Sequence, residues 1–296
     1  MTGPILDNFR ASLLMVASMA FFAVEDALIK RASVHLPVGQ ILMMLGAGGF
    51  VLLAIYAAQR GQTVFSAGFF ARPVLLRNLA ELIGTAGFVT ALALNPITTA
   101  SVILQASPLV VTMGAALFLG EAVGWRRWSA VLVGLAGVVL ILRPGMEGFR
   151  AEALWAVIGV LGLSMRDVVT RRVPSGVTTL QLTAWAFLSV VFAGMLTLGF
   201  GPPLGVPPIR TGIELFAAMS LGLVGYAILT IAVRGGDLSV VAPFRYSRLL
   251  FAIVIGFLIF DERPDWPMWV GASLIVGSGL YTLMRESRLR RRVTSP

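Results

Sequence analysis

The sequence has no cysteine and only one histidine, His35, among its 296 residues. Without thiols the chain cannot form disulfides, iron–sulfur clusters or a thiolate nucleophile. A single histidine cannot supply a metal site of the usual multi-ligand kind. The nucleotide-binding motif Gly-x-x-x-x-Gly-Lys-Ser/Thr is also absent, so hydrolysis of ATP by this chain is not expected. We therefore expect no metal site, no cofactor and no catalytic residues.

Charge is scarce as well. Charged residues make up 12% of the chain, hydrophobic residues 57%, and the mean hydropathy is +0.90. Soluble domains carry about twice this charged fraction. A net charge of +9 is also found in proteins that bind nucleic acid, but here the arginines are scattered between apolar runs, which is typical of membrane proteins. The expected partners are the lipid bilayer and a small-molecule substrate, with no nucleic acid.

The apolar residues form long runs separated by short polar or Gly/Pro-containing breaks. About 20 apolar residues cross a bilayer core. This pattern predicts an all-α integral membrane protein with ten transmembrane helices, in which short loops make successive helices antiparallel. The predicted spans are 11–30, 38–58, 74–94, 98–119, 127–143, 152–170, 179–199, 212–233, 239–260 and 267–284.

The distribution of lysine and arginine predicts the orientation. With the N-terminus inside, the inner loops and ends hold more than twice as many basic residues as the outer loops. We therefore expect a multi-pass protein of the cell (inner) membrane with both termini cytoplasmic. Residues 286–296 would form a basic cytoplasmic tail that favours anionic lipid headgroups.

The chain contains an internal repeat at an offset of 141 residues. At this offset Asp26 aligns with Asp167, Glu121 with Glu262, and Trp125 with Trp266. The repeat predicts two five-helix units, 1–143 and 144–285. Because five is odd, the second unit enters the membrane from the opposite side, as in the inverted repeats of secondary transporters. Gene duplication without a transport role is the alternative.

The end of each unit carries a recognisable pattern. In the first unit a helix with an internal Pro108 ends in Gly120-Glu121 before Trp128 and a glycine-rich final helix. This pattern resembles the EamA unit of the drug/metabolite transporter superfamily. The second unit has Leu249 in place of Pro108 and Asp261 in place of Gly120. The resemblance implies ten helices, cytoplasmic termini and export or exchange of small metabolites, as in amino-acid exporters of the YddG type.

Ionisable residues inside predicted spans are costly, by about 3 kcal/mol each, and usually face the protein interior or a wet cavity. We expect a gating charge cluster at the cytoplasmic approach to a central cavity, in which an arginine meets a substrate carboxylate. Glu25 and Asp26 would form its outer counterpart, opposite Gln105 and Ser107. A static ion-pair network is the alternative. The cluster residues are Arg166, Asp167, Arg245 and Arg248.

Other polar residues within spans are candidates for structure or for the cavity wall. Arg77 and Glu81 have the spacing of an intrahelical ion pair, and Glu121 and Glu262 are interpreted as helix-end anchors. Polar aromatic residues in spans need partners for their polar atoms and usually point inward. The predicted cavity wall includes Asn78, Thr85, Trp185, Tyr226 and Tyr246.

These features favour a secondary transporter that works by alternating access, a monomer or homodimer, with amino acids, including aromatic ones, as substrates. The alternatives are an intramembrane enzyme and a passive channel. An enzyme would need a catalytic group, and only the carboxylates within the spans could supply one.

Overall fold

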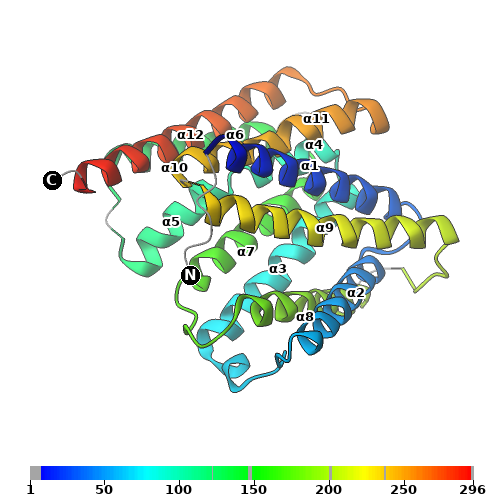
Figure 1. Ribbon diagram of the computed structural model, residues 1–296. Helices are drawn as coiled ribbons and strands as arrows, with labels where there is room; N and C mark the ends of the chain where they lie inside the picture. The colour runs from blue at the N-terminus through cyan, green and yellow to red at the C-terminus, as the bar shows by residue number, and fades with distance from the viewer. Residues whose placement is uncertain (1–7, 122, 146–148, 200–201, 237, 295–296) are drawn as a thin grey trace.

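The computed structural model describes residues 8–121, 123–145, 149–199, 202–236 and 238–294. Within these residues the structure is entirely helical, and ten helices are long and apolar enough to cross a membrane. The expected fold class is therefore confirmed, and each predicted span overlaps one observed span. The start of α1 and the end of α12 lie at the same end of the bundle (Figure 1). We call this the terminal end and the opposite one the far end.

Eight spans consist of one long helix, and two are divided. Short 3-10 turns precede α3 and α7, at Ala67–Phe70 and Ala151–Ala153. The helices are α1 Asn8–Ala32, α2 Val38–Gln59, α3 Arg72–Leu94, α4 Ile97–Leu104, α5 Ser107–Leu119, α6 Trp125–Leu142, α7 Leu154–Thr170, α8 Thr179–Leu198, α9 Ile209–Gly235, α10 Leu238–Val241, α11 Ser247–Phe260 and α12 Trp266–Thr294.

The two divided spans are the fourth and the ninth, which are equivalent in the repeat. In the fourth span, α4 ends at Leu104 and α5 begins at Ser107. Pro108 has no N–H to donate to the Leu104 carbonyl, so the α-helical pattern breaks one turn before it. In the ninth span, α10 passes into a 3-10 helix, Ala242–Tyr246, before α11. The break persists there although Leu249 replaces Pro108.

Helices of one half of the chain pack mainly against helices of the other half. The most extensive helix contacts are α1 with α9, α3 with α7, α2 with α8, and α6 with α12, and each pair takes one helix from each half. Figure 1 shows these pairs side by side around the bundle. The core therefore lies between the repeats, so neither half buries its inner face alone.

Glycines permit the closest of these contacts. Gly84 and Gly87 of α3 face Gly159 and Gly162 of α7, and Gly137 of α6 faces Gly271 of α12. A Cβ on Gly87 would lie 2.7 Å from the Gly159 nitrogen. Without side chains at these crossings, backbones can touch, which is how membrane helices gain packing energy without a hydrophobic driving force.

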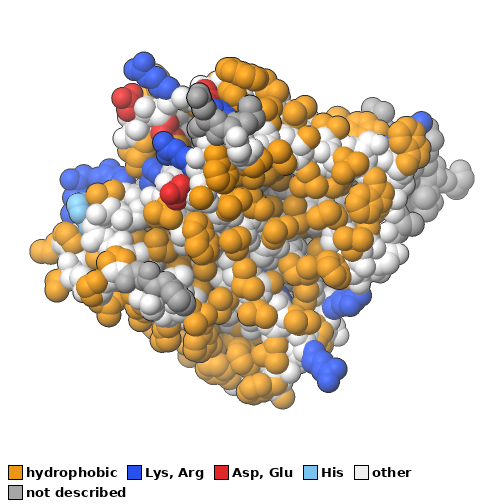
Figure 2. Space-filling model, turned by 180° about the vertical axis from the view of Figure 1, so that it is seen from behind, with side chains coloured by type: hydrophobic (Ala, Val, Ile, Leu, Met, Phe, Trp, Pro, Cys, Tyr) orange, Lys and Arg blue, Asp and Glu red, His pale blue; other side chains and the backbone are white. Residues whose placement is uncertain are grey.

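The outside of the bundle is apolar between charged ends. Figure 2 shows hydrophobic side chains over most of one face, with charged groups near its two ends. Leu132, Phe216 and Leu258 are among the exposed apolar residues. A surface of this kind matches lipid. In the predicted basic tail, α12 continues to Thr294, but the side chains from 286 onward and residues 295–296 lie outside what the structure describes.

Candidate functional site

The middle of the bundle contains an ion pair between the two halves. Asp26 of α1 accepts hydrogen bonds from Arg248 of α11, with Nη2 at 2.7 Å from Oδ2 and 2.8 Å from Oδ1, and Nε at 3.1 Å from Oδ2. The Asp26 side chain is 3% exposed and that of Arg248 17%. The pair is thus largely removed from solvent but still accessible at the arginine.

Two aromatic rings flank this pair. The Arg248 guanidinium carbon lies 5.3 Å from the centre of the Phe22 ring and 5.6 Å from that of Phe88. Phe22 precedes Asp26 by one helical turn on α1, and Phe88 projects from α3. Rings at this distance attract a guanidinium through their quadrupole and exclude water around it. We call Asp26, Arg248, Phe22 and Phe88 the central site.

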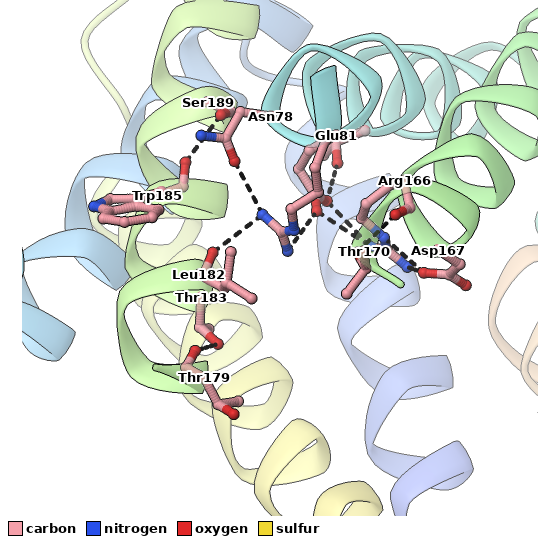
Figure 3. A network of polar contacts seen from close by, with 12 residues as sticks. Asn78, Glu81, Arg166, Asp167, Thr170, Thr179, Leu182, Thr183, Trp185 and Ser189 are labelled. Carbon is pink, nitrogen blue, oxygen red and sulfur yellow. Dashed lines mark hydrogen bonds and ion pairs between the residues drawn. The ribbon is translucent and has the colours of Figure 1, made fainter. Parts of the chain in front are cut away.

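A second group of charges joins α3 to α7, and we call it the second ion-pair cluster (Figure 3). Arg166 of α7 donates to both Glu81 oxygens, at 3.2 and 3.3 Å, and its Nε lies 2.9 Å from Asp167 Oδ1. Arg77 lies 3.5 Å from Glu81, as expected for residues four apart on one helix. Glu81 therefore holds two arginines and also accepts from Thr85 at 3.1 Å.

The structure divides the predicted gating cluster in two. Arg166 and Asp167 pair as expected, and Arg245 interacts electrostatically with Asp167. Arg248, however, pairs with Asp26, so its assignment to this cluster is wrong. The prediction assumed a regular α-helix with both arginines on one face. The 3-10 turn over Ala242–Tyr246 changes the rise and the angle per residue, and α11 packs on α1.

The predicted grouping of Glu25 and Asp26 with Gln105 and Ser107 is also wrong. Gln105 donates to the Arg245 carbonyl at 3.4 Å, and the Ser107 hydroxyl lies 3.0 Å from that of Ser164. These two polar residues therefore stabilise the broken fourth span rather than facing the acids of α1.

Three of the predicted cavity-wall aromatics have different surroundings. Trp185 is fully buried, donates to the Val64 carbonyl at 3.0 Å and packs edge-to-face on Phe69. Figure 3 shows it pointing away from Arg166. Tyr246 is buried with its hydroxyl against Gly279 of α12. Tyr226 is 44% exposed and interacts electrostatically with Arg77. Tyr246 interacts electrostatically with Arg245 in the same way, so both tyrosines lie near charged groups and Trp185 does not; the cavity-wall role of these residues stays a prediction.

Asn78 accepts a hydrogen bond from Arg77 at 3.1 Å and is buried. With Trp185 and Ser189 it lines a 170 Å³ pocket between α3 and α8. Leu79 and Phe192 at the same pocket are half exposed on the apolar surface. Asn78 and Trp185 thus share a pocket, but it opens toward the lipid-facing side of α3 and α8.

Sequence reasoning missed several residues. It treated Glu81 as part of a local pair with Arg77, although Glu81 also binds Arg166 across the helix interface. It also overlooked Phe22 and Phe88. The four-residue spacing of Phe22 and Asp26 was available as a signal, since such residues share a helix face. No local signal marks Phe88, which reaches Arg248 only through the packing of α3.

At the far end of the bundle a glutamate caps a helix. Glu262 accepts from the Ile97 N–H at 2.6 Å and the Thr98 N–H at 3.0 Å, and it also contacts the Thr98 hydroxyl. A carboxylate at a helix N-terminus satisfies its free N–H groups and favours the helix dipole. Lys30 adds bonds to the carbonyls of Leu92, at 3.2 Å, and Asn95.

The repeat-equivalent residues at the terminal end make different contacts. Glu121, the equivalent of Glu262, pairs with Arg171, the equivalent of Lys30, and both side chains are about half exposed. Arg172 donates to the Phe118 carbonyl. The same exposure difference appears beside the breaks, where Ile103 is 1% exposed but its equivalent Phe244 is 42% exposed. The two ends of the molecule are thus built from equivalent residues in different arrangements.

The fold and the polar interior define a multi-pass membrane protein with two repeated halves. The pattern of the EamA-like transporter family matches residues 9–143 and again residues 150–284. The chain therefore belongs to the EamA-like transporter family, in the drug/metabolite transporter superfamily, as its sequence pattern indicated.

Relatives with known names support the same class. The chain is 30% identical over 221 residues to a riboflavin transporter of Rhizobium johnstonii, covering 74% of this chain and 72% of that protein. It is 28% identical to an S-adenosylmethionine uptake transporter of Rickettsia felis, covering 74% of each. It is 27% identical to the pseudopaline exporter CntI of Pseudomonas aeruginosa, covering 92% of this chain and 95% of that one.

A solved crystal structure shares the fold, with a TM-score of 0.60 and 23% identity over 97% of this chain and 99% of that one. Together these findings make the chain a small-molecule transporter of the membrane.

Proposed function

We propose that this chain is a secondary transporter that exports or exchanges small carboxylate-bearing metabolites, amino acids including aromatic ones, by alternating access. In this proposal it lies in the cell inner membrane with both termini in the cytoplasm, so the terminal end of the bundle is the inner end. The observation that carries the proposal is the Asp26–Arg248 pair, a buried charge pair between the two halves with aromatic rings on either side.

The central site suits a carboxylate beside an apolar group. Asp26 takes the Nε and Nη2 donors of Arg248, and among the described residues Nη1 has no hydrogen-bond acceptor. A guanidinium can bind two carboxylates through separate edges of its planar fork. Phe22 and Phe88 would contact the side chain of an aromatic solute. Relatives named for riboflavin, S-adenosylmethionine and pseudopaline support a small organic solute.

The difference between the two ends supports alternating access. In an inverted repeat, exchanging the conformations of the halves turns each end into the other. The exchange would move Glu121 from Arg171 to the start of α10, and it would release Glu262 from the start of α4. With Glu262 capping α4 at the far end and the equivalent Glu121 half exposed at the terminal end, the present arrangement would correspond to the state open to the cytoplasm.

The test is solute counterflow in proteoliposomes, with a panel of radiolabelled amino acids. Preloaded unlabelled solute should accelerate uptake of the labelled solute, and the solute should be recovered chemically unchanged. Flux without counterflow would instead indicate a channel, and chemical conversion an enzyme.

Variants of Arg248 test the central site in the same assay. Arg248→Ala and Arg248→Lys should each lower exchange at least about tenfold, since neither keeps the bidentate geometry. Arg263→Ala, at a side chain 83% exposed beyond α11, is the matched control and should exchange normally. Full activity of both Arg248 variants at normal expression would remove Arg248 from the mechanism.

A further inference from the structure

Glu25 differs from Asp26, Glu81 and Asp167, three other acids within the membrane-spanning segments. Asp26 pairs with Arg248, Glu81 with Arg77 and Arg166, and Asp167 with Arg166. Among the described residues, Glu25 forms no ion pair and no hydrogen bond, although it lies in the interior of α1 beside the central site. An ionised carboxylate at such a depth is costly unless a cation or several donors compensate it.

Among the residues that the structure describes, a glycine provides space for the Glu25 carboxyl group and none donates a hydrogen bond to it. The carboxylate lies against Gly222 of α9, where a Cβ would come within 2.8 Å of the carboxyl carbon and 2.9 Å of Oε2. Gly222 lies inside a continuous helix, so its N–H is used within α9. One turn further, Gly225 faces Phe21 and Phe22. A side chain at position 222 would displace Glu25, so the glycine creates the place where the carboxyl group sits.

The charged groups that face Glu25 do not neutralise it. They are Asp26 on its own helix and Arg248 on α11, and on α9 the carboxylate lies against Gly222. Arg248 already binds Asp26 through two nitrogens. Asp26 and Glu25 together place two acids beside one arginine, so the group as a whole is compensated when one of the acids carries a proton.

The other half of the chain supplies a natural comparison. At the repeat offset Glu25 is equivalent to Arg166, and Gly222 is equivalent to Glu81. Where α3 packs on α7, Arg166 and Glu81 form an ion pair. Where α1 packs on α9, the equivalent positions hold Glu25 and Gly222. The repeat architecture thus accommodates a complete ion pair here, and α1 instead carries an acid without a counter-ion.

We infer that Glu25 binds and releases one proton during the transport cycle and so couples solute movement to the proton gradient. This inference rests on the proposed transport function. The carboxylate gains a proton to become a neutral acid when the site is closed around it. It returns the proton to water when the site opens and a solute ammonium group or water replaces the proton as the partner of the carboxylate. In this exchange the solute ammonium group takes the place of the proton beside Glu25 while Arg248 binds the carboxylate of the same solute, so one proton leaves for each neutral zwitterion that enters.

Infrared difference spectroscopy of the purified protein in lipid bilayers tests proton binding without any solute. Wild type should show a protonated-carboxyl stretching band at neutral pH that disappears at alkaline pH. Glu25→Gln should lack this band, whereas Glu25→Asp should keep a titrating band at a shifted frequency. Glu214→Gln is the matched control, because Glu214 is paired with Arg31 and Arg210 near the far end, and it should retain the wild-type band. An unchanged band in Glu25→Gln would overturn the inference.

A transport measurement separates this inference from the proposed function. With the amino acid of the panel that wild type exchanges fastest, Glu25→Gln should lose accumulation driven by a pH gradient, whereas Glu25→Asp, which keeps a titratable carboxyl group, should still accumulate the solute. If wild type shows no counterflow, the proposed function fails, whatever the infrared result. If Glu25→Gln accumulates solute in a pH gradient as wild type does, proton coupling through Glu25 fails while the carrier function stands.

Discussion

Gly120 and Asp261 occupy equivalent positions at the ends of α5 and α11, and both have left-handed backbones, with φ of 71° and 50°. This conformation costs an L-residue about 1–2 kcal/mol, and less for Asp, whose short polar side chain can bond locally. The replacement of the family's glycine by Asp261 therefore preserves the turn at some expense of stability. A single sequence difference between the two halves thus has a local physical explanation.

Substitutions at these two positions should have opposite effects on stability. We expect Asp261→Gly to raise the free energy of unfolding by about 0.5–1 kcal/mol and Gly120→Ala to lower it by about 1 kcal/mol, because only glycine adopts this conformation without strain. Thermal unfolding of the detergent-solubilised protein measures both. Gly124→Ala is the control, since Gly124 has φ of −69° and open space around it, and should not destabilise. A destabilised Asp261→Gly would contradict this account.

At the scale of single residues, the sequence predicted a contact within one helix but not the contacts between helices. Arg77 and Glu81 could be paired from their spacing alone. Arg248 and Asp26 are 222 positions apart, and their meeting depends on how α11 packs against α1. Pro243 in the 3-10 helix before α11 marks a break in this span, but it does not indicate which partner Arg248 meets.

At the scale of the helices, number, order and ends could be predicted because lipid imposes a minimum length on each apolar segment. The break between α4 and α5 could also be predicted from Pro108, because proline has no N–H to donate to the preceding turn of the helix. The pairing of helices could not be predicted in this way. Short loops indicate which helices are antiparallel neighbours along the chain, whereas the largest contacts join helices of different halves.

The α3–α7 crossing yields a prediction for such a contact. A Cβ on Gly84 would lie 2.9 Å from the Gly162 carbonyl carbon, where backbone cannot easily give way. Gly84→Ala should therefore lower the free energy of unfolding by about 1–3 kcal/mol, the usual range for overpacking. Gly277→Ala, in the interior of α12 with open space around it, should instead gain about 0.5–1 kcal/mol from helix propensity. Equal thermal stability of the two variants would contradict close packing at this crossing.

For the molecule as a whole, the repeat allows equivalent residues at the two ends to be compared in accessibility. Ile103 and Phe244 are equivalent, yet one is buried and the other is 42% exposed. Because the chain has no native cysteine, single-cysteine variants carry no background for thiol labelling. A membrane-impermeant maleimide should label Phe244→Cys rapidly in inside-out vesicles. In the proposed orientation the far end faces outside, and the same reagent should label Ile103→Cys slowly in right-side-out vesicles because Ile103 is 1% exposed.

Removal of the far-end cap should shift this balance. Glu262 caps α4 through the N–H groups of Ile97 and Thr98. Loss of a capping interaction of about 1–1.5 kcal/mol changes an equilibrium by about tenfold. Adding Glu262→Gln to Ile103→Cys should thus raise its labelling rate from the outer side by about tenfold, and Glu121→Gln should not. If both glutamine variants leave labelling of Ile103→Cys unchanged, Glu262 does not hold the far end closed. If Ile103→Cys and Phe244→Cys react equally fast to begin with, the two ends do not differ in access.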